Sequence, residues 1–327
     1  MTPPVPSLAV GVITYRRPDR LERLLASLAT IALPTQMRLE TIVIVDNDAE
    51  GSAKLTVDRW LDRIPGLNYV SETSTGLSVA RNKAIDSAAS DWIAFIDDDE
   101  EASRDWLIEL TETQVATKAD AVMGNTVFAF EATPPPWLVG AKVYNFEPAV
   151  GHEQPTKYLS TNNLLVRTSI TEQLGPLFDD RFAKTGGEDH HLGHRLTKAG
   201  LLIVQSHRAW TTEWVPAERM KLRVIAKRLQ RDGNTLAIVD LADAQNASER
   251  RSIKLRHLLE GFAKLPLGIV RGALFGARSG RGGLLRGVRT SLIGIGQLKA
   301  VAGHDVVGYH VAENHVAENH FTAQNSA

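Results

Sequence analysis

Short apolar runs alternate with stretches of helical periodicity through the first third of the chain, and this alternation constrains the fold more than any other feature. Three runs have strand length and are rich in β-branched or aromatic residues: Leu8–Thr14, Thr41–Val45 and Trp92–Ile96. After the first run, leucines recur at helical spacing, at Leu21, Leu24, Leu25 and Leu28. Strands that are apolar on both faces and alternate with helices indicate an α/β fold with a Rossmann-like, mostly parallel sheet flanked by helices.

The pattern continues less regularly through the rest of the chain. We expect further strands at Leu67–Val70, Ala121–Phe128, Leu164–Val166 and Leu201–Gln205. We expect helices after Gly76, after Ser103 as an N-cap, and over His190–Ala199. The proline run before Trp137 predicts a rigid turn with an exposed aromatic ring, and Phe178–Asp189 predicts a loop.

Composition limits the class of protein. The chain has 327 residues, of which 43% are hydrophobic, and it contains no cysteine, which fits a reducing compartment. The start, MTPPVPSLAV, lacks the basic and then apolar pattern of a signal peptide. No uncharged apolar run approaches the ~18 residues that a membrane span needs. These features predict a cytoplasmic protein that is at most peripheral on the inner face of the cell membrane.

Charge is distributed unevenly along the chain. Between Arg250 and Ala300 there are eleven basic residues and a single acid, Glu260. The same region contains an apolar stretch, Leu265–Ala277, and glycines that recur every four residues, at Gly268, Gly272, Gly276 and Gly280. Two interpretations stay open: basic amphipathic helices that lie on an anionic membrane surface, or closely packed core helices with a solvated basic face. Nucleic-acid binding is not expected, because aromatic residues are nearly absent from this region.

An acidic run directly follows the predicted strand Trp92–Ile96. Its five members are Asp97, Asp98, Asp99, Glu100 and Glu101. Carboxylates that are crowded at the end of a buried strand repel one another unless a cation or strong hydrogen-bond donors lie among them. Because Mg²⁺ and Mn²⁺ prefer carboxylate oxygens together with substrate phosphates, the run predicts a site for a metal-bound nucleotide diphosphate. A solvated acidic loop is the alternative.

Other polar residues follow predicted strands or begin predicted helices. Asp46 and Asn47 follow the second strand, and Arg81 lies in the helix opened by Gly76. Ligands bind beyond the carboxyl ends of the strands in open α/β sheets. Asp46 can therefore accept from a base or ribose, Arg81 can contact phosphates, and the acidic run can hold a metal.

A further carboxylate follows the Gly186-Gly187 turn. Glu188 and Asp189 begin a predicted helix there, far in sequence from the acidic run. A sugar transfer that inverts the anomeric centre needs a carboxylate to take the proton from the acceptor hydroxyl, and Asp189 is the best candidate. His191, two residues later, is a candidate third metal ligand, although a solvated histidine is the alternative.

Several of these segments together resemble the family 2 glycosyltransferases of the GT-A fold. The matching segments, in the order of that family, are VGVITYRRPDRLERLLASL, IVIVDNDAEGSA, GLSVARNKAID, WIAFIDDDEEASRDWL, STNNLLVR, FDDRFAKTGGEDHHLGHRL and VPAERMKLRVIAKRLQRDGNT. They span approximately residues 8–235. The chain is most similar to the bacterial exopolysaccharide type, such as the succinoglycan-biosynthesis glucosyltransferases.

The resemblance implies a role for each matching residue. Donor-binding residues would be Thr14, Asp46, Asn47, Arg81, Asp97 and Asp98. Mn²⁺ or Mg²⁺ would be held by Asp97 and Asp99, with His191 as a further candidate, and Asp189 would be the catalytic base beside Glu188. Acceptor contacts would come from Trp137, Asn162 and Asn163. The usual Asp-x-Asp of the family is here Asp-Asp-Asp-Glu, so the sequence leaves open which acids hold the metal.

The resulting prediction is an inverting hexosyltransferase that uses a nucleotide-diphosphate sugar, with UDP-glucose favoured, in surface polysaccharide synthesis. Its acceptor would be a saccharide or a polyprenyl-linked saccharide, and an anionic membrane surface is a further candidate partner. The alternatives are a non-catalytic glycan-binding or nucleotide-sugar-binding relative and a sugar nucleotidyltransferase. We predict a GT-A domain over residues 1–235, a basic helical extension over 236–300, and a flexible tail over 301–327 that contains the repeat VAENH-VAENH.

Overall fold

The computed structural model describes residues 4–144, 148 and 150–306. The chain divides into two compact units. We call Met1–Ala129, Asn145–Ala183 and Glu188–Trp214 the sheet unit, and Phe130–Tyr144, Lys184–Gly187 and Val215–Ala327 the helical unit. The predicted domain boundaries stay predictions. Residues 307–327, which hold most of the predicted tail with both copies of its repeat, lie outside the described part of the chain.

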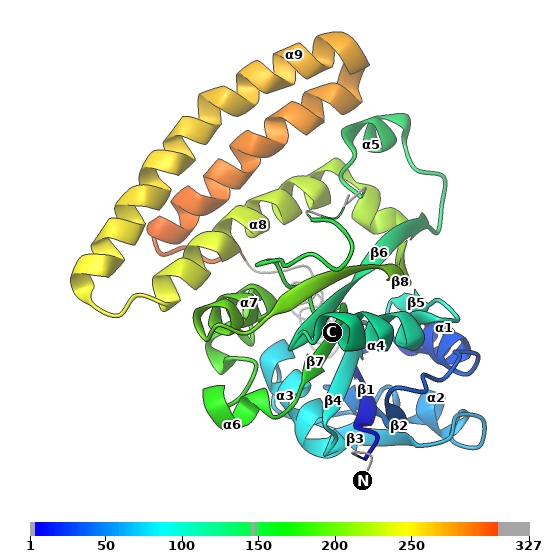
Figure 1. The fold of residues 1–327 in the computed structure, drawn as a ribbon. Coiled ribbons are helices and arrows are strands. Elements are labelled where there is room, and N and C mark those ends of the chain that lie inside the picture. Colours follow the sequence, from blue (N-terminus) through cyan, green and yellow to red (C-terminus); the bar gives the residue numbers. More distant parts are fainter. Residues whose placement is uncertain (1–3, 145–147, 149, 307–327) are drawn as a thin grey trace, which may run out of the picture. The chain divides into compact units, whose positions relative to one another are not determined.

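In the sheet unit, the first four strands are parallel. They are β1 (Ser7–Thr14), β2 (Arg38–Asp46), β3 (Leu67–Ser71) and β4 (Trp92–Ile96). β1 pairs with both β2 and β4, and β3 extends the sheet beyond β2. The sequence order therefore reverses between β1 and β4 (Figure 1). Such a reversal is the point at which open α/β sheets bind their ligands.

The remaining strands add antiparallel pairs. β7 (Asn163–Arg167) pairs with β4 on one side and with β6 (Ala121–Phe130) on the other, and β5 (Glu100–Ala102) pairs with β8 (Ile203–Val215). Within the described residues the sheet has eight strands, in the order β3-β2-β1-β4-β7-β6-β8-β5. The prediction of a mostly parallel sheet flanked by helices is confirmed, with an antiparallel extension.

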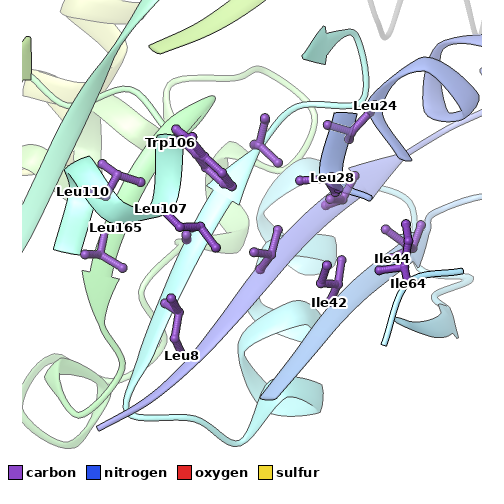
Figure 2. Close-up of a cluster of buried hydrophobic side chains, with 14 of the residues drawn as sticks. Leu8, Leu24, Leu28, Ile42, Ile44, Ile64, Trp106, Leu107, Leu110 and Leu165 are labelled. Atoms are coloured by element: carbon purple, nitrogen blue, oxygen red, sulfur yellow. The ribbon is translucent and has the colours of Figure 1, made fainter. Parts of the chain in front are cut away.

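The two faces of the sheet explain why its strands are apolar throughout. Ile42 and Ile44 point to one face and Val43 and Val45 to the other, because side chains alternate along a strand. The first face packs against α1 (Pro18–Leu28) and α4 (Trp106–Thr117), as the labelled leucines and Trp106 show in Figure 2. The second face packs against α3 (Leu77–Ala88) and α7 (Glu188–Lys198). The short helices α2 (Lys54–Asp58), α6 (Ile170–Leu174) and η1 (Asp180–Phe182) complete the unit.

Some local predictions differ from the structure. Strand β5 begins within the acidic run, for which we predicted no strand. It forms because its residues pair with β8, which extends far beyond the predicted Gln205. Ser103 does not cap α4 with its side chain; the N-cap is Asp105, and the Ser103 carbonyl accepts from the Trp106 amide at 3.0 Å. The turn predicted at Trp137 forms a short helix, α5 (Pro136–Ala141).

The helical unit contains a long hairpin. Besides α5, it holds η2 (Ala217–Met220), α8 (Leu222–Ala242) and α9 (Ala247–Val301). The backbone of α9 leaves helical geometry at Ser279 and Gly280, where φ of Gly280 is +60°, so α9 consists of two antiparallel arms (Figure 1). In the described part of the chain, no helix is both long and apolar enough to cross a membrane.

Glycines let the hairpin arms approach each other closely. A Cβ atom on Gly287 would lie 2.1 Å from the backbone nitrogen of Gly272 on the opposite arm. A Cβ atom on Gly296 would lie 1.9 Å from the Gln230 carbonyl of α8. The second arm therefore packs between the first arm and α8. Together with Gly268 and Gly272 of the four-residue repeat, these glycines form a helix-packing seam, which agrees with one of our two interpretations.

We expect Gly287→Ala to lower the free energy of unfolding by about 1–3 kcal/mol or more, because the added methyl group meets backbone that cannot move aside. Gly276→Ala is the matched control, since its Cβ atom would meet nothing nearer than 3.5 Å. Replacing a helical glycine by alanine there should be neutral or stabilising by up to ~1 kcal/mol. Thermal unfolding of both variants is the measurement; equal effects of the two would contradict the packed seam.

Candidate active site

The predicted donor-binding and metal-binding residues that follow β1, β2 and β4 gather where these strands end. These strands are parallel neighbours, so Thr14, Asp46 and Asp97 meet at one edge of the sheet. The Thr14 hydroxyl donates to the Asp98 carboxylate at 2.8 Å. The contact joins the ends of β1 and β4, at the reversal of strand order where ligands of open α/β sheets bind.

Two arginines from the start of α1 face the acidic run. Arg17 Nη1 lies 3.3 Å from Asp98 Oδ1 and 3.6 Å from Asp99 Oδ2. Arg20 Nη1 lies 3.3 Å from the same Asp99 oxygen. Both carboxylates are buried. We did not predict a role for these arginines, but one signal was available: Arg17 follows the first strand, and Arg20 comes three residues later on the same side of the helix.

Arg81 joins the acidic run to α7. Its guanidinium forms a close ion pair with Glu188 and lies 3.5 Å from Asp97, over the Phe178 ring. Burial disfavours the charge, but Glu188 and Asp97 outweigh that effect and raise the pKa of Arg81. The second Glu188 oxygen, Oε2, is buried without a hydrogen-bond partner among the described residues. Residues distant in sequence thus form one charged network.

The acids of the run differ in their surroundings. Loss of solvation raises the pKa of Asp97, and it raises the pKa of Asp98 to about 6, with the neighbouring carboxylates adding to both effects. The Asp97 side chain is still 42% exposed, so it is accessible to a ligand. Burial raises the pKa of Glu100 well above its ordinary value. A divalent cation beside these groups would favour their charged forms.

The oxygen donors fit a divalent cation that is shared with a substrate. No three His, Asp or Glu side chains in the described residues form a ready-made metal site. Mg²⁺, however, is commonly held by one or two carboxylates together with substrate phosphates and water. Asp97 and Asp99 provide two such carboxylates. His191, the further candidate ligand, contacts other residues. Its ring packs on Phe182, and its Nδ1 atom lies 3.9 Å from the Asp179 carboxylate.

Asp46 and Asn47 hold the loops around the site. Asp46 is completely buried and accepts hydrogen bonds from the Ala53 amide at 2.8 Å and the Tyr69 hydroxyl at 3.0 Å. Asn47 donates to the carbonyls of Glu72 and Ser74 and accepts from the Gly76 amide at 2.9 Å. These contacts fix the loop that leads into α3. Direct contact of either residue with a nucleotide stays a prediction.

Asp189 lies in the first turn of α7, beside Glu188. The preceding glycines both have positive φ, +76° at Gly186 and +101° at Gly187, as a sharp turn requires. The Asp189 carboxylate accepts from the His190 backbone amide at 2.7 Å and is half-buried. Glu188 points to Arg81, whereas Asp189 follows it by one residue around the helix, so the two carboxylates leave α7 in different directions.

The predicted acceptor residues have different surroundings. Asn162 is half-buried and donates to Glu100 at 2.6 Å and to Thr126 at 2.9 Å. Asn163 is 1% exposed; its amide accepts from the Trp106 indole and donates to the carbonyls of Asn125 and Ala209. Asn163 therefore belongs to the framework, and its contact with an acceptor stays a prediction. Trp137 belongs to the helical unit, in α5, and is half-buried.

Comparison with known proteins decides the family. Residues 9–175, just over half of the chain, match the family described as glycosyl transferase family 2. The chain belongs to this family. It is 36% identical over 255 residues to the succinoglycan biosynthesis protein ExoM of Rhizobium meliloti, which covers 77% of this chain and 81% of that protein. This chain is therefore a glycosyltransferase, related to a succinoglycan biosynthesis protein, and the nucleotidyltransferase alternative is set aside.

Solved structures confirm the fold class. The mannosyltransferase PcManGT from Pyrobaculum calidifontis, in complex with GDP-Man and Mn²⁺, has a TM-score of 0.61 at 17% identity, covering 90% of this chain and 87% of that one. TarS of S. aureus, in complex with UDP, has a TM-score of 0.53 at 14% identity, covering 91% and 92%. At such identities the likeness shows the fold alone, which is of the GT-A type.

We expect Asn163→Ala to lower the free energy of unfolding by about 2–4 kcal/mol, because several buried groups lose their partners at about 1–3 kcal/mol each. Asn162→Ala is the matched control and should cost less, because Asn162 is more exposed. Denaturant unfolding gives both values. A normal stability of Asn163→Ala with a raised KM for an acceptor would restore Asn163 to the acceptor site.

Proposed function

We propose that this glycosyltransferase moves a hexose, with inversion, from a nucleotide-diphosphate sugar to a saccharide or lipid-linked saccharide during the synthesis of a surface polysaccharide. The observation that carries the proposal is the charged network of Asp97, Arg81 and Glu188, with Asp189 adjacent to it. The relation to a succinoglycan biosynthesis protein supports the class of product. UDP-glucose is the favoured donor, and the reaction belongs at the cytoplasmic face of the cell membrane.

The donor diphosphate would lie at the reversal of strand order. Arg81 offers a buried, charged guanidinium, and Arg17 and Arg20 add two more cations beside the acidic run. Guanidinium groups bind phosphate oxygens through paired hydrogen bonds. Thr14 and Asp98, which are already hydrogen-bonded to each other, would contact the nucleoside together with Asp46 and Asn47. The network thus has groups for both halves of a nucleotide sugar.

Asp97 and Asp99 would hold Mn²⁺ or Mg²⁺ together with the donor. When bound, such a cation neutralises the charge that develops on the leaving diphosphate. Two structures of similar fold contain Mn²⁺: PcManGT, in complex with GDP-Man and Mn²⁺, and GalNAc-T7, with UDP, GalNAc and Mn²⁺. In this chain the arginines facing the acidic run keep Asp98 and Asp99 in place before a donor arrives.

Asp189 would act as the general base. As the acceptor oxygen forms its bond to the anomeric carbon, its proton passes to the Asp189 carboxylate. The bond from that carbon to the diphosphate breaks, and the diphosphate leaves with the electron pair. A single displacement of this kind inverts the anomeric centre. Glu188 would serve the reaction by holding Arg81, and Asn162 would contact the acceptor.

We expect Asp189→Asn to lower kcat by about 10²–10⁴-fold while donor affinity stays near that of the wild type, because the amide cannot take the acceptor proton. Asp180→Asn, at an exposed aspartate of the same segment, is the matched control and should keep full activity. Steady-state kinetics and donor titration separate the two effects. A variant with weakened donor binding and normal turnover would assign Asp189 to binding.

We expect Asp99→Asn to lose most of the stabilisation that a donor together with Mn²⁺ provides in thermal unfolding, because one of two metal-binding carboxylates is gone. Glu101→Gln removes a charge from the same run at a half-exposed residue and should behave as wild type. A screen of UDP-glucose and GDP-mannose, each with Mn²⁺ or EDTA, also tests the nucleotide. Full transfer in excess EDTA would exclude the metal role.

A further inference from the structure

The first arm of α9, from Ala247 to the break at Ser279, has one packed side. Gly261, Gly268 and Gly272 lie against the second arm. A Cβ atom on Gly268, for example, would lie 2.1 Å from the Ser291 hydroxyl of that arm. His257 continues this side and contacts Asp240 of α8 at 2.8 Å. The packed side is therefore occupied from one end of the arm to the other.

The opposite side of the same arm is apolar and open. Its large exposed residues include Leu255, Leu259, Phe262, Ile269, Val270 and Leu274, which we call the apolar stripe. Leu259 is 62% exposed, Phe262 57% and Ile269 66%. At 1.5 Å per residue the stripe is about 28 Å long. A contiguous exposed apolar surface of this kind on a soluble domain marks an interaction site.

Basic residues lie at both ends of the stripe. Exposed cations near its first end are Arg251, Lys254 and Arg256, of which Arg256 pairs with Asp240 of α8, and exposed cations near its second end are Arg271, Arg278 and Arg281. Beyond its first turn this arm has one acidic residue among those described, Glu260. Its carboxylate accepts hydrogen bonds from Lys264 and Gln297, each at 3.1 Å. The field around the stripe is therefore positive. Apolar side chains between clusters of cations match a surface that is anionic outside and apolar beneath.

We propose that the first arm of α9 docks flat on an anionic phospholipid bilayer, with the apolar stripe inserted among the lipids. The flanking arginines and lysines would contact the negatively charged headgroups, as basic amphipathic helices do. Four charged residues lie between Leu255 and Gly272, which suits a helix in the interface plane rather than across the bilayer. The proposal rests on the proposed function in one respect, because a lipid-linked acceptor is confined to the same surface.

The first test uses the full chain and sedimentation with vesicles of phosphatidylcholine alone or with added phosphatidylglycerol, without donor or acceptor. We expect binding to the anionic vesicles at low salt. The double variant Leu259→Asp/Phe262→Asp should bind at least tenfold more weakly. Leu33→Asp/Leu55→Asp is the matched control, because these leucines are at least as exposed but lie in the sheet unit, and it should bind like the wild type.

A second variant tests the charges without changing the stripe. Arg271→Gln/Arg278→Gln should weaken binding several-fold at low salt, and raising the salt to about 0.5 M should release part of the wild-type protein, because salt screens the headgroup attraction. Circular dichroism confirms that each variant is folded. Hydrolysis of the donor in solution is measured separately, so that loss of vesicle binding and loss of the proposed reaction are distinguished.

Two outcomes would overturn the proposal. The first is that the wild-type protein ignores anionic vesicles at low salt. The second is that light scattering finds a dimer that Leu259→Asp/Phe262→Asp converts to a monomer, with no binding of either protein to vesicles. In that case a second copy of the chain covers the stripe.

Discussion

The acidic run at the end of β4 is the constraint on which the sheet unit depends. A buried strand that ends in consecutive carboxylates brings like charges together where solvent is scarce, and this is costly without opposite charges nearby. Arg17 at the N-cap of α1, Arg20 of α1 and Arg81 of α3 are those charges. Two helices must therefore begin at the same edge of the sheet as the acids. The four parallel strands, in the order β3-β2-β1-β4, place the starts of both helices at that edge.

Arg81 extends this constraint to α7. A buried arginine is tolerated only when its charge is compensated, and breaking a buried pair costs about 3–5 kcal/mol. Glu188 supplies the compensation, and so the start of α7 is held against the acidic run. The same ion pair therefore also positions Asp189, which is the next residue in the chain. The same interaction that keeps a charge buried thus positions the carboxylate proposed as the base.

In the helical unit, one arm combines two properties that the sequence presents as alternatives. Glycines permit close packing on one side of the arm, and apolar side chains with flanking cations occupy the other. A single helix can do both because residues three or four apart share a side. The packed seam is what leaves the apolar stripe in a fixed, exposed row.

The sequence by itself determined the strands and helices that can be recognised from their own pattern of apolar residues. Trp92–Ile96 has the predicted bounds because it is apolar on both faces and ends at the charges. The gathering of Thr14, Asp46 and Asp97 also followed from strand order alone.

The tertiary structure decided the features that depend on partners distant in the chain. The acids of β5 form a strand only because β8 lies beside them, and Asn163 became a framework residue through its contact with Trp106. Arg17 and Arg20 joined the site because α1 starts beside β4. Such contacts join residues far apart in the chain, and no local pattern records which of them will meet.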